Sequence, residues 1–305
     1  MLHHGLNDVL TGKRIGVFGK GGSGKSTVVV LLARALRRQG YNVCVLDADS
    51  TNVGLHQALG IEDPPRSLID HFGGMVFSGG AVTCPVDDPT VIADAEMSLS
   101  DLPSAYVRET EDGIVLLSAG KIGDQGPGAG CDGPIAKIAC DLRVHLDDEE
   151  PVTLIDFKAG FEDSARGAIT SLDWVLAVVD PTTAAVQMAI HLTRMVAAIQ
   201  SGEPPSTRHL ENPEMVRLAE QLFRDATIRG VPVVLNKIAS ANMEEYLRHA
   251  LHEANIEPIG VVHEESELGM AWLRGAPLAG DQANADIEAI VRELEHRQSR
   301  EEVHA

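Results

Sequence analysis

The chain has 305 residues, of which 44% are hydrophobic and 23% are charged, a composition typical of globular proteins rather than of disordered chains. Its 45 acidic and 25 basic residues give a formal net charge of −20, which repels phosphate backbones and anionic lipid. The four cysteines are too few for a disulfide scaffold, no apolar run is long enough to span a bilayer, and the N-terminus lacks the apolar stretch of a signal peptide, so we expect a cytoplasmic protein.

The first predicted elements are a strand, a glycine-rich turn, a helix and a second strand. Residues 15–18 form an apolar run typical of a buried strand, and residues 19–24 are rich in glycine. Residues 26–39 carry apolar side chains at helical spacing and precede Gly40, which favours a helix end there. Residues 43–46 are again apolar. Because parallel strands need a crossover connection, the order predicts a βαβ unit.

The same alternation continues along the chain. Short apolar runs predict further strands, and helical patterns separate them and close the sequence. We therefore predict an α/β fold with a doubly wound, mainly parallel sheet of about seven or eight strands and helices on both faces. The expected strands are 113–117, 152–155, 174–179, 231–235 and 259–262, and the expected helices are 134–146, 182–199, 242–254, 265–274 and 285–296.

Two stretches interrupt the alternation and are expected to be insertions. Residues 62–112 contain Pro-Pro and Gly-Gly pairs, and residues 201–225 have a Gly-Glu-Pro-Pro run before a short helix. The predicted organisation is an N-terminal extension (1–13), a single domain that contains both insertions (14–280), and a C-terminal helix and tail (281–305).

The glycine-rich turn carries a phosphate-binding motif. Residues 19–26 fit the pattern G-x-x-x-x-G-K-[ST] and lie between a strand and a helix, as this pattern requires. Its glycines let backbone N–H groups point at phosphate oxygens, and the helix presents its positive N-terminus to the same anion. Lys25 would reach the β- and γ-phosphates, and the Ser26 hydroxyl would ligate Mg²⁺. The residues expected to bind the nucleotide here are Gly21, Gly22, Ser23, Gly24, Lys25, Ser26 and Thr27.

Carboxylates follow two of the apolar strands, at the edge of a parallel sheet where ligands bind. Residues 43–46 lead into Asp47-Ala48-Asp49, and a later strand leads into Asp156, as in a Walker B segment. Asp156 is expected in the shell of the metal ion, with Asp47 supporting the ion through water, and Asp49 would hold or polarise the attacking water. The alternative is a helix N-cap cluster after the strand, because Asp, Ser and Thr all cap well.

The P-loop resembles that of the MinD/ParA/nitrogenase iron protein class of deviant Walker A ATPases. Its second lysine, Lys20, stands where the lysine of that class reaches across a dimer interface to the partner's nucleotide. The resemblance implies a P-loop NTPase fold, a homodimer on ATP binding, and catalytic roles for Lys20, Lys25 and Asp49. It also implies that Asn236, in a Val-Leu-Asn-Lys segment, contacts the adenine edge, whereas an Asn that turns the chain after a strand is the alternative.

Residues 156–167 are similar to the D-x-x-A-G-x-E-x-x-x-R-G segment of the carbon monoxide dehydrogenase accessory ATPase (CooC) family. This resemblance implies that the chain assists a metalloenzyme client by metal delivery or cofactor insertion. CooC-like proteins carry a Cys-x-Cys pair that can bind metal between two subunits, but here Cys131 is followed by Asp132 and Gly133. Cys131 is therefore either a soft-metal ligand or a small structural thiol.

The predicted function is a dimeric switch that binds and hydrolyses ATP with Mg²⁺ and helps a metalloenzyme to mature. One alternative is a MinD/ParA-type positioning ATPase, which needs a membrane or DNA surface, and another is an electron-transferring ATPase like the iron protein. Residues 293–305 lack the apolar face of an amphipathic anchor, and the charge of −20 opposes DNA binding. We therefore expect neither a nucleic-acid partner nor a stable membrane anchor.

Overall fold

The computed structural model describes residues 9–122, 131–146, 149–160 and 167–304. Its main sheet is built from short strands whose middle members are buried on both faces, as the apolar runs predict. The strands are β1 (Arg14–Gly19), β2 (Val43–Ala48), β4 (Arg108–Glu109), β5 (Ile114–Ser118), β7 (Val152–Phe157), β8 (Trp174–Val179), β9 (Val233–Ile238) and β10 (Gly260–His263).

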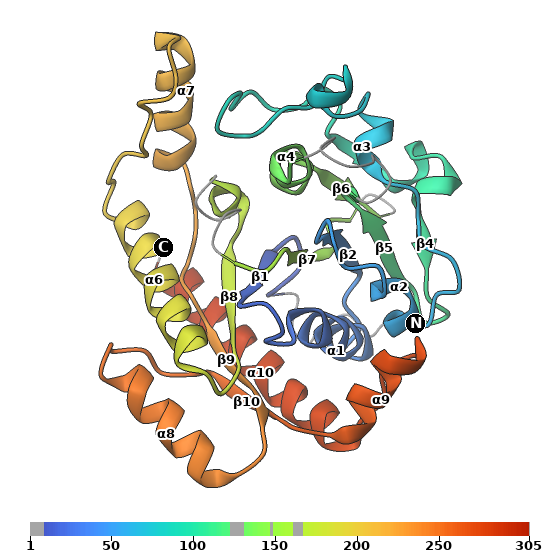
Figure 1. Ribbon diagram of the computed structural model, residues 1–305, viewed down its shortest axis with the longest axis vertical. Helices are drawn as coiled ribbons and strands as arrows, with labels where there is room; N and C mark the ends of the chain where they lie inside the picture. The colour runs from blue at the N-terminus through green and yellow to red at the C-terminus, as the bar shows by residue number, and fades with distance from the viewer. Residues whose placement is uncertain (1–8, 123–130, 147–148, 161–166, 305) are drawn as a thin grey trace.

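These strands form one eight-stranded sheet in the order β10-β9-β8-β1-β7-β2-β5-β4 (Figure 1). Every pair is parallel except β4 with β5 at one edge. The predicted α/β fold with a doubly wound, mainly parallel sheet is confirmed. Because β1 lies between β7 and β8, the chain reverses its direction of winding there, and the loop after β1 opens into the crevice where such sheets bind ligands.

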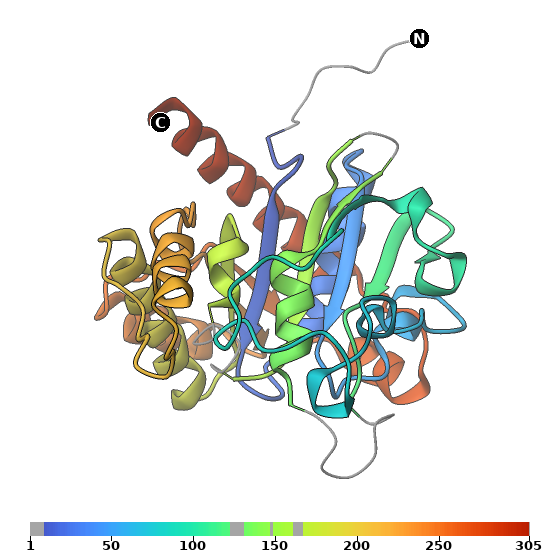
Figure 2. The same cartoon turned by 90° about the horizontal axis from the view of Figure 1, so that it is seen from above.

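Helices cover both faces of the sheet, on two separate hydrophobic clusters. Along β2 the side chains alternate between them: Val43 and Val45 face one cluster, and Cys44 and Leu46 face the other. In Figure 2, α4 lies in front of the strands and α10 lies behind them. The cluster that contains Val43 and Val45 packs on the helices α1 (Lys25–Arg38), α2 (Leu55–Leu59), α9 (Ser266–Arg274) and α10 (Asp281–His304). The cluster that contains Cys44 and Leu46 packs on the helices α4 (Gly133–Asp141), α6 (Thr183–Gln200) and α8 (Ala241–His252).

The expected helix over 134–146 is wrong at its C-terminal end. The helix α4 stops at Asp141, and Arg143–His145 form a strand, β6, which pairs in parallel with β3 (Glu96–Ser98) of the first insertion. The buried guanidinium of Arg14 ends the helix, because its two Nη atoms donate to the carbonyl oxygens of Leu142 and Ala139 at 2.8 and 2.7 Å.

The two insertions hold short elements, as expected. The first contains α3 (Leu68–His71) as well as β3, and the second contains the helix α7 (Pro213–Arg224), which has no fully buried residue. None of the described helices has the length and apolar composition needed to cross a bilayer.

The C-terminal helix is longer than the expected range of 285–296 and is anchored at several points. Its residues Ile287 and Ile290 are fully buried, and two polar side chains of the sheet layer bind it: Trp174 Nε1 donates to Gln298 Oε1 at 2.9 Å, and the Tyr41 hydroxyl donates to Glu295 at 2.8 Å. The division into extension, central domain and C-terminal helix stays a prediction.

Candidate active site

The loop between β1 and α1 has the backbone that a phosphate cradle requires. Gly22 and Gly24 lie in the left-handed region, with φ of 80° and 90°. Any side chain at Gly24 would collide with the amide of Asn236. Lys25 begins α1 and is only 6% exposed, and it lines a cavity together with Gly21, Gly22 and Ser26.

Two side chains of β9 bind backbone carbonyl oxygens of this loop. Asn236 donates from Nδ2 to the carbonyl oxygen of Ser23 at 2.7 Å, and Lys237 donates from Nζ to the carbonyl oxygen of Gly22 at 2.7 Å. Both lie within β9 rather than after it, because the strand begins and ends later than the expected 231–235. Contact of Asn236 with the adenine edge stays a prediction. Sequence reasoning missed Lys237, which lies beside the predicted Asn236.

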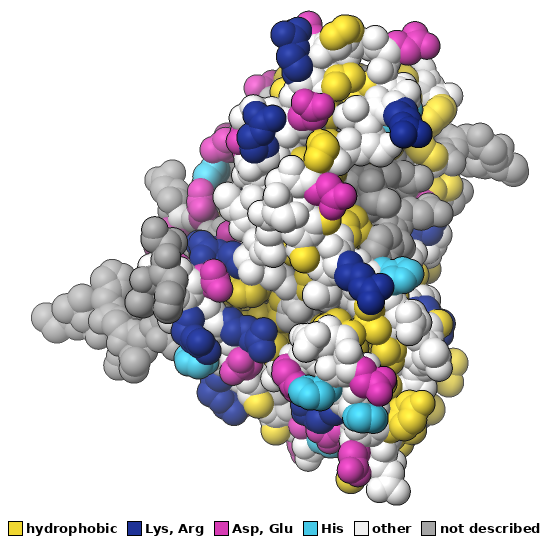
Figure 3. Space-filling model, turned by 90° about the vertical axis from the view of Figure 1, so that its left-hand side faces the viewer, with side chains coloured by type: hydrophobic (Ala, Val, Ile, Leu, Met, Phe, Trp, Pro, Cys, Tyr) yellow, Lys and Arg dark blue, Asp and Glu magenta, His cyan; other side chains and the backbone are white. Residues whose placement is uncertain are grey.

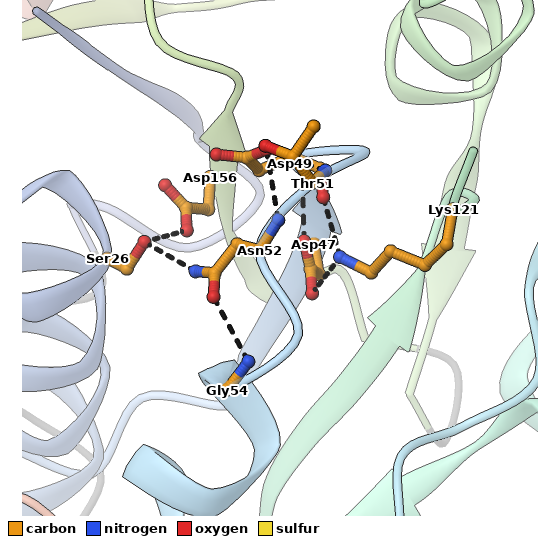
Figure 4. Close-up of polar contacts among 8 residues, drawn as sticks. All are labelled: Ser26, Asp47, Asp49, Thr51, Asn52, Gly54, Lys121 and Asp156. Carbon is orange, nitrogen blue, oxygen red and sulfur yellow. Dashed lines mark hydrogen bonds and ion pairs between the residues drawn. The ribbon is translucent and has the colours of Figure 1, made fainter. Parts of the chain in front are cut away.

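The parallel register brings the predicted carboxylates together. Asp47 of β2 pairs with Asp156 of β7 at the carboxyl end of the sheet. Asp156 is 0% exposed, and its Oδ2 accepts a hydrogen bond from the Ser26 hydroxyl at 2.5 Å (Figure 4). The same hydroxyl accepts from Asn52 Nδ2 at 2.9 Å. Among the described residues, Asp156 Oδ1 has no hydrogen-bond partner although it is buried.

This arrangement fits a divalent cation. An unpaired buried carboxylate oxygen beside a hydroxyl supplies the oxygen ligands that Mg²⁺ prefers. Burial, reinforced by the charge of Asp47, raises the pKa of Asp156 to about 7, against the hydrogen bond from Ser26. A cation bound here would return the carboxylate to its charged form.

Lys121, which the sequence analysis did not place in the site, binds the carboxylate of Asp47. Its Nζ lies 2.7 Å from Asp47 Oδ2 and donates to the carbonyl oxygen of Asp49 at 2.6 Å (Figure 4). Burial raises the pKa of Asp47 to about 6, and the Lys121 ammonium opposes that rise. Lys121 follows β5, the neighbour of β2, so the rule that functional side chains gather at carboxyl ends of parallel strands would have found it.

Asp49 closes the turn that follows β2. Its Oδ1 accepts from Thr51 N at 2.9 Å, from Thr51 Oγ1 at 2.7 Å and from Asn52 N at 3.2 Å. The helix-capping alternative is wrong, because α2 begins at Leu55 with Gly54 as its N-cap residue and no side chain caps it, whereas Asp49 binds Thr51 and Asn52 in the turn before it. Asp49 also lines the cavity that contains the P-loop, so its predicted role toward water stays open to test.

Lys20 lies apart from these groups. Its Nζ is 3.8 Å from Asp180 Oδ2, at the end of β8, and its side chain is 40% exposed. It does not line the P-loop cavity. Its reach across a dimer interface stays a prediction.

The cavity has a volume of about 680 Å³, which suits a small-molecule ligand. Its wall runs from the P-loop to the ends of β9 and β10 and to α9. Trp272 of α9 donates from Nε1 to Thr27 Oγ1 at 2.9 Å, so this wall is tied to the P-loop helix. A second cavity of about 830 Å³ is lined by Asp47 and Thr51. Thr51 also lines the first cavity, so the two cavities are neighbours.

Cys131 is half-buried and immediately precedes a carboxylate that links two loops of the site. Asp132 accepts from the Ser50 hydroxyl, and its Oδ2 lies 2.6 Å from Lys158 Nζ, two residues after Asp156.

Within the described ranges, no group of three or more His, Cys, Asp or Glu side chains is arranged to hold a metal ion. Residues 128–130 of the run before Cys131 and residues 161–166 of the CooC-like segment lie outside the described residues.

The family follows from comparison with known proteins. The model of the CobQ/CobB/MinD/ParA nucleotide binding domain matches residues 17–278. The chain belongs to this family. It is a nucleotide-binding ATPase of the MinD/ParA class, as its P-loop predicts.

Individual relatives agree with this assignment. The carbon monoxide dehydrogenase accessory protein CooC of Rhodospirillum rubrum is 31% identical over 285 residues, 92% of this chain and 97% of that protein, which confirms the CooC-like resemblance. An uncharacterized ATP-binding protein of Methanocaldococcus jannaschii is 35% identical over 179 residues, 58% of this chain and 70% of its own length.

Solved structures confirm the fold. The cell division ATPase MinD of Pyrococcus furiosus superposes with a TM-score of 0.57 at 18% identity, covering 93% of this chain and 99% of that chain. MinD of Pyrococcus horikoshii, solved as a complex with Mg-ADP, gives a TM-score of 0.57 at 18% identity, covering 92% of this chain and 95% of that chain.

Proposed function

We propose that the chain is a Mg²⁺-dependent ATPase switch that dimerises on ATP binding and assists the maturation of a metalloenzyme. The observation that carries the first part is Asp156. A carboxylate that is fully buried, with one oxygen unpaired and the other bound by the P-loop serine, costs stability unless a cation completes it.

The residues support a direct hydrolysis mechanism. The P-loop amides and Lys25 would bind the β- and γ-phosphates and neutralise charge that develops during transfer. Ser26 and Asp156, with Asp47 behind them, would hold Mg²⁺, which would supply positive charge to offset the negative charge of the phosphates and of the leaving group. Asp49 would orient a water for in-line attack on the γ-phosphorus. The bond to the β–γ bridging oxygen then breaks, giving ADP and phosphate.

Two features support the client part of the proposal. The similarity to CooC covers 92% of this chain, so it includes the surfaces around the site as well as the P-loop. Asp132 joins the segment after Asp49 to the segment after Asp156, and it adjoins Cys131. A movement of either segment on ATP binding would therefore be transmitted through Asp132 to the neighbouring Cys131.

The hydrolytic role is tested by separating nucleotide binding from turnover. In Lys25→Ala the phosphates lose their cationic partner, so nucleotide binding should weaken. In Asp49→Asn the amide oxygen can still close the turn, so ATP binding should survive while hydrolysis falls by at least about 100-fold. Calorimetric binding and phosphate release measure the two effects.

A matched control comes from Asp88 in the first insertion. Its Oδ1 accepts from Thr90 N at 2.9 Å and from Thr90 Oγ1 at 2.6 Å, the same turn that Asp49 makes. Asp88→Asn should hydrolyse ATP at the parent rate. If Asp49→Asn does so too, the assignment of Asp49 is wrong.

A further inference from the structure

The nucleotide cavity has an imidazole in the part of its wall that the ends of β9 and β10 form. His263 ends β10 and lines the cavity together with Asn236 and Leu268. Its side chain is 44% exposed. Because the P-loop fixes where phosphates bind, the ribose and base of a bound nucleotide must extend along the rest of the cavity, toward the ends of β9 and β10.

The carboxylate of Asp286 in α10, whose side chain is 10% exposed, fixes the orientation of this imidazole. Asp286 Oδ2 lies 2.8 Å from His263 Nδ1 and accepts from the His263 backbone N–H, also at 2.8 Å. The other oxygen, Oδ1, accepts from Gln282 Nε2 at 2.8 Å. Both oxygens of Asp286 are thus occupied, and the ring is held on its Nδ1 edge.

The partner also selects the tautomer. A carboxylate only accepts hydrogen bonds, so Nδ1 carries the proton, and in the neutral ring Nε2 is left as an acceptor. Asp286 does not line the cavity, whereas His263 does. The Nε2 edge, opposite the carboxylate, is therefore the one available to a ligand.

We propose that His263 selects the base of the nucleotide: its Nε2 accepts a hydrogen bond from the 6-amino group of adenine. A 6-oxopurine presents a carbonyl oxygen at that position, which would place one lone pair against another and leave both groups unpaired. This inference rests on the proposed nucleotide-binding function and adds its base specificity. Asn236 lines the same part of the cavity, where its Nδ2 donates to the Ser23 carbonyl oxygen.

The test compares the binding of ATP and of ITP, the 6-oxo analogue, by titration calorimetry at pH 8 with Mg²⁺. The full chain should bind ATP at least about tenfold more tightly than ITP, on the scale of one mismatched hydrogen bond. In His263→Ala the ratio should fall to below about threefold, chiefly through weaker ATP binding. Asp286→Ala should lower the ratio as well, because the ring is no longer held.

Controls separate this inference from the proposal beneath it. His252 of α8 also pairs with a carboxylate, Glu257 at 2.5 Å, but lies outside the cavity, so His252→Ala should keep the parent ratio. An unchanged ATP-to-ITP ratio in His263→Ala would overturn the role of His263. Failure of the unaltered chain to bind either nucleotide would instead contradict the proposed function.

Discussion

The burial of the Asp156 carboxyl group costs the fold stability. The residue is fully buried, and one carboxylate oxygen has no hydrogen-bond partner among the described residues. Protonation of the carboxyl group lowers this cost, and burial accordingly raises the pKa of Asp156 to about 7. Residues that bind ligands commonly carry such a penalty.

A stability prediction follows for Asp156→Asn. The folded protein keeps a proton on Asp156 up to about pH 7, whereas the unfolded chain loses it near the ordinary pKa of about 3.9. The folded state therefore binds more protons between these values, and the wild-type free energy of unfolding falls as the pH rises through that window. The uncharged variant should be more stable by on the order of 1–3 kcal/mol at pH 8, and the difference should shrink toward pH 5.

Urea unfolding of both proteins without Mg²⁺ or nucleotide, at pH 8 and pH 5, measures this difference. Asp88→Asn, in the first insertion, serves as the control for removing a charge and should show no such pH dependence. Equal stabilities of wild type and Asp156→Asn at both pH values would contradict the buried, unpaired carboxylate.

Lys121 is predicted to position the Asp47–Asp49 turn. Its ammonium binds both the Asp47 carboxylate and the Asp49 carbonyl oxygen, so Lys121→Met should let the turn shift. We expect kcat for ATP hydrolysis to fall about tenfold, equivalent to about 1.4 kcal/mol, with KM changed much less. Lys121→Arg keeps a cationic donor and should recover part of the rate. A change in KM alone would point to substrate binding instead.

At the scale of elements, the parallel core was predictable and its exceptions were not. The strands β1, β2, β7 and β8 follow short apolar runs that are buried on both faces, which is a strong local signal. The end of α4 depends on Arg14, which is far away in the sequence, and β6 depends on a partner strand in an insertion. Such contacts leave no periodic pattern near the residues concerned.

The residues of the candidate site likewise fall into those that the sequence predicts and those that it does not. The P-loop motif and the strand-end carboxylates locate Ser26, Asp47 and Asp156, because the parallel register alone brings these strand ends together. Lys237, Trp272 and His263 come from the far edge of the sheet and from α9. Their place beside the P-loop depends on strand order and helix packing, so no local motif marks them.

The N-terminus of α4 yields a prediction about metal. In the proposed dimer each subunit would offer Cys131 where CooC-like proteins have two cysteines, and Gly133 packs against Cys84 instead of carrying a thiol. Two thiolates per dimer fall short of the usual four ligands of a Zn²⁺ or Ni²⁺ site. We expect little or no metal in the reduced protein after anaerobic purification, as measured by elemental analysis. One tightly bound ion per dimer that is lost in Cys131→Ser would refute this.

On the scale of the whole molecule, the acidic excess is spread among basic side chains on the one face that Figure 3 shows. On the face formed by α6, α7 and α8, basic and acidic side chains are interspersed (Figure 3). The excess of acidic groups, with a net charge of −20, opposes association between copies unless specific contacts outweigh it. A nucleotide that brings two subunits together must therefore supply attraction at the site itself.

Lys20 is the residue through which we expect that attraction to act. In the single chain its ammonium lies 3.8 Å from Asp180, a loose and partly exposed pair that costs little to break. A partner's triphosphate would be a stronger counterion than Asp180. Lys20 would then complete the neighbouring site rather than its own.

The most direct test of the ATP-driven switch is the mass of the Asp49→Asn protein in solution, measured by light scattering with and without Mg²⁺-ATP. We predict that ATP converts monomer to dimer, and that adding Lys20→Glu abolishes this change while ATP binding persists. Adding Lys13→Glu, the same charge reversal just before β1 at the opposite edge of the sheet, should leave the dimer intact. Equal ATP-dependent dimerisation with and without Lys20→Glu would contradict the account.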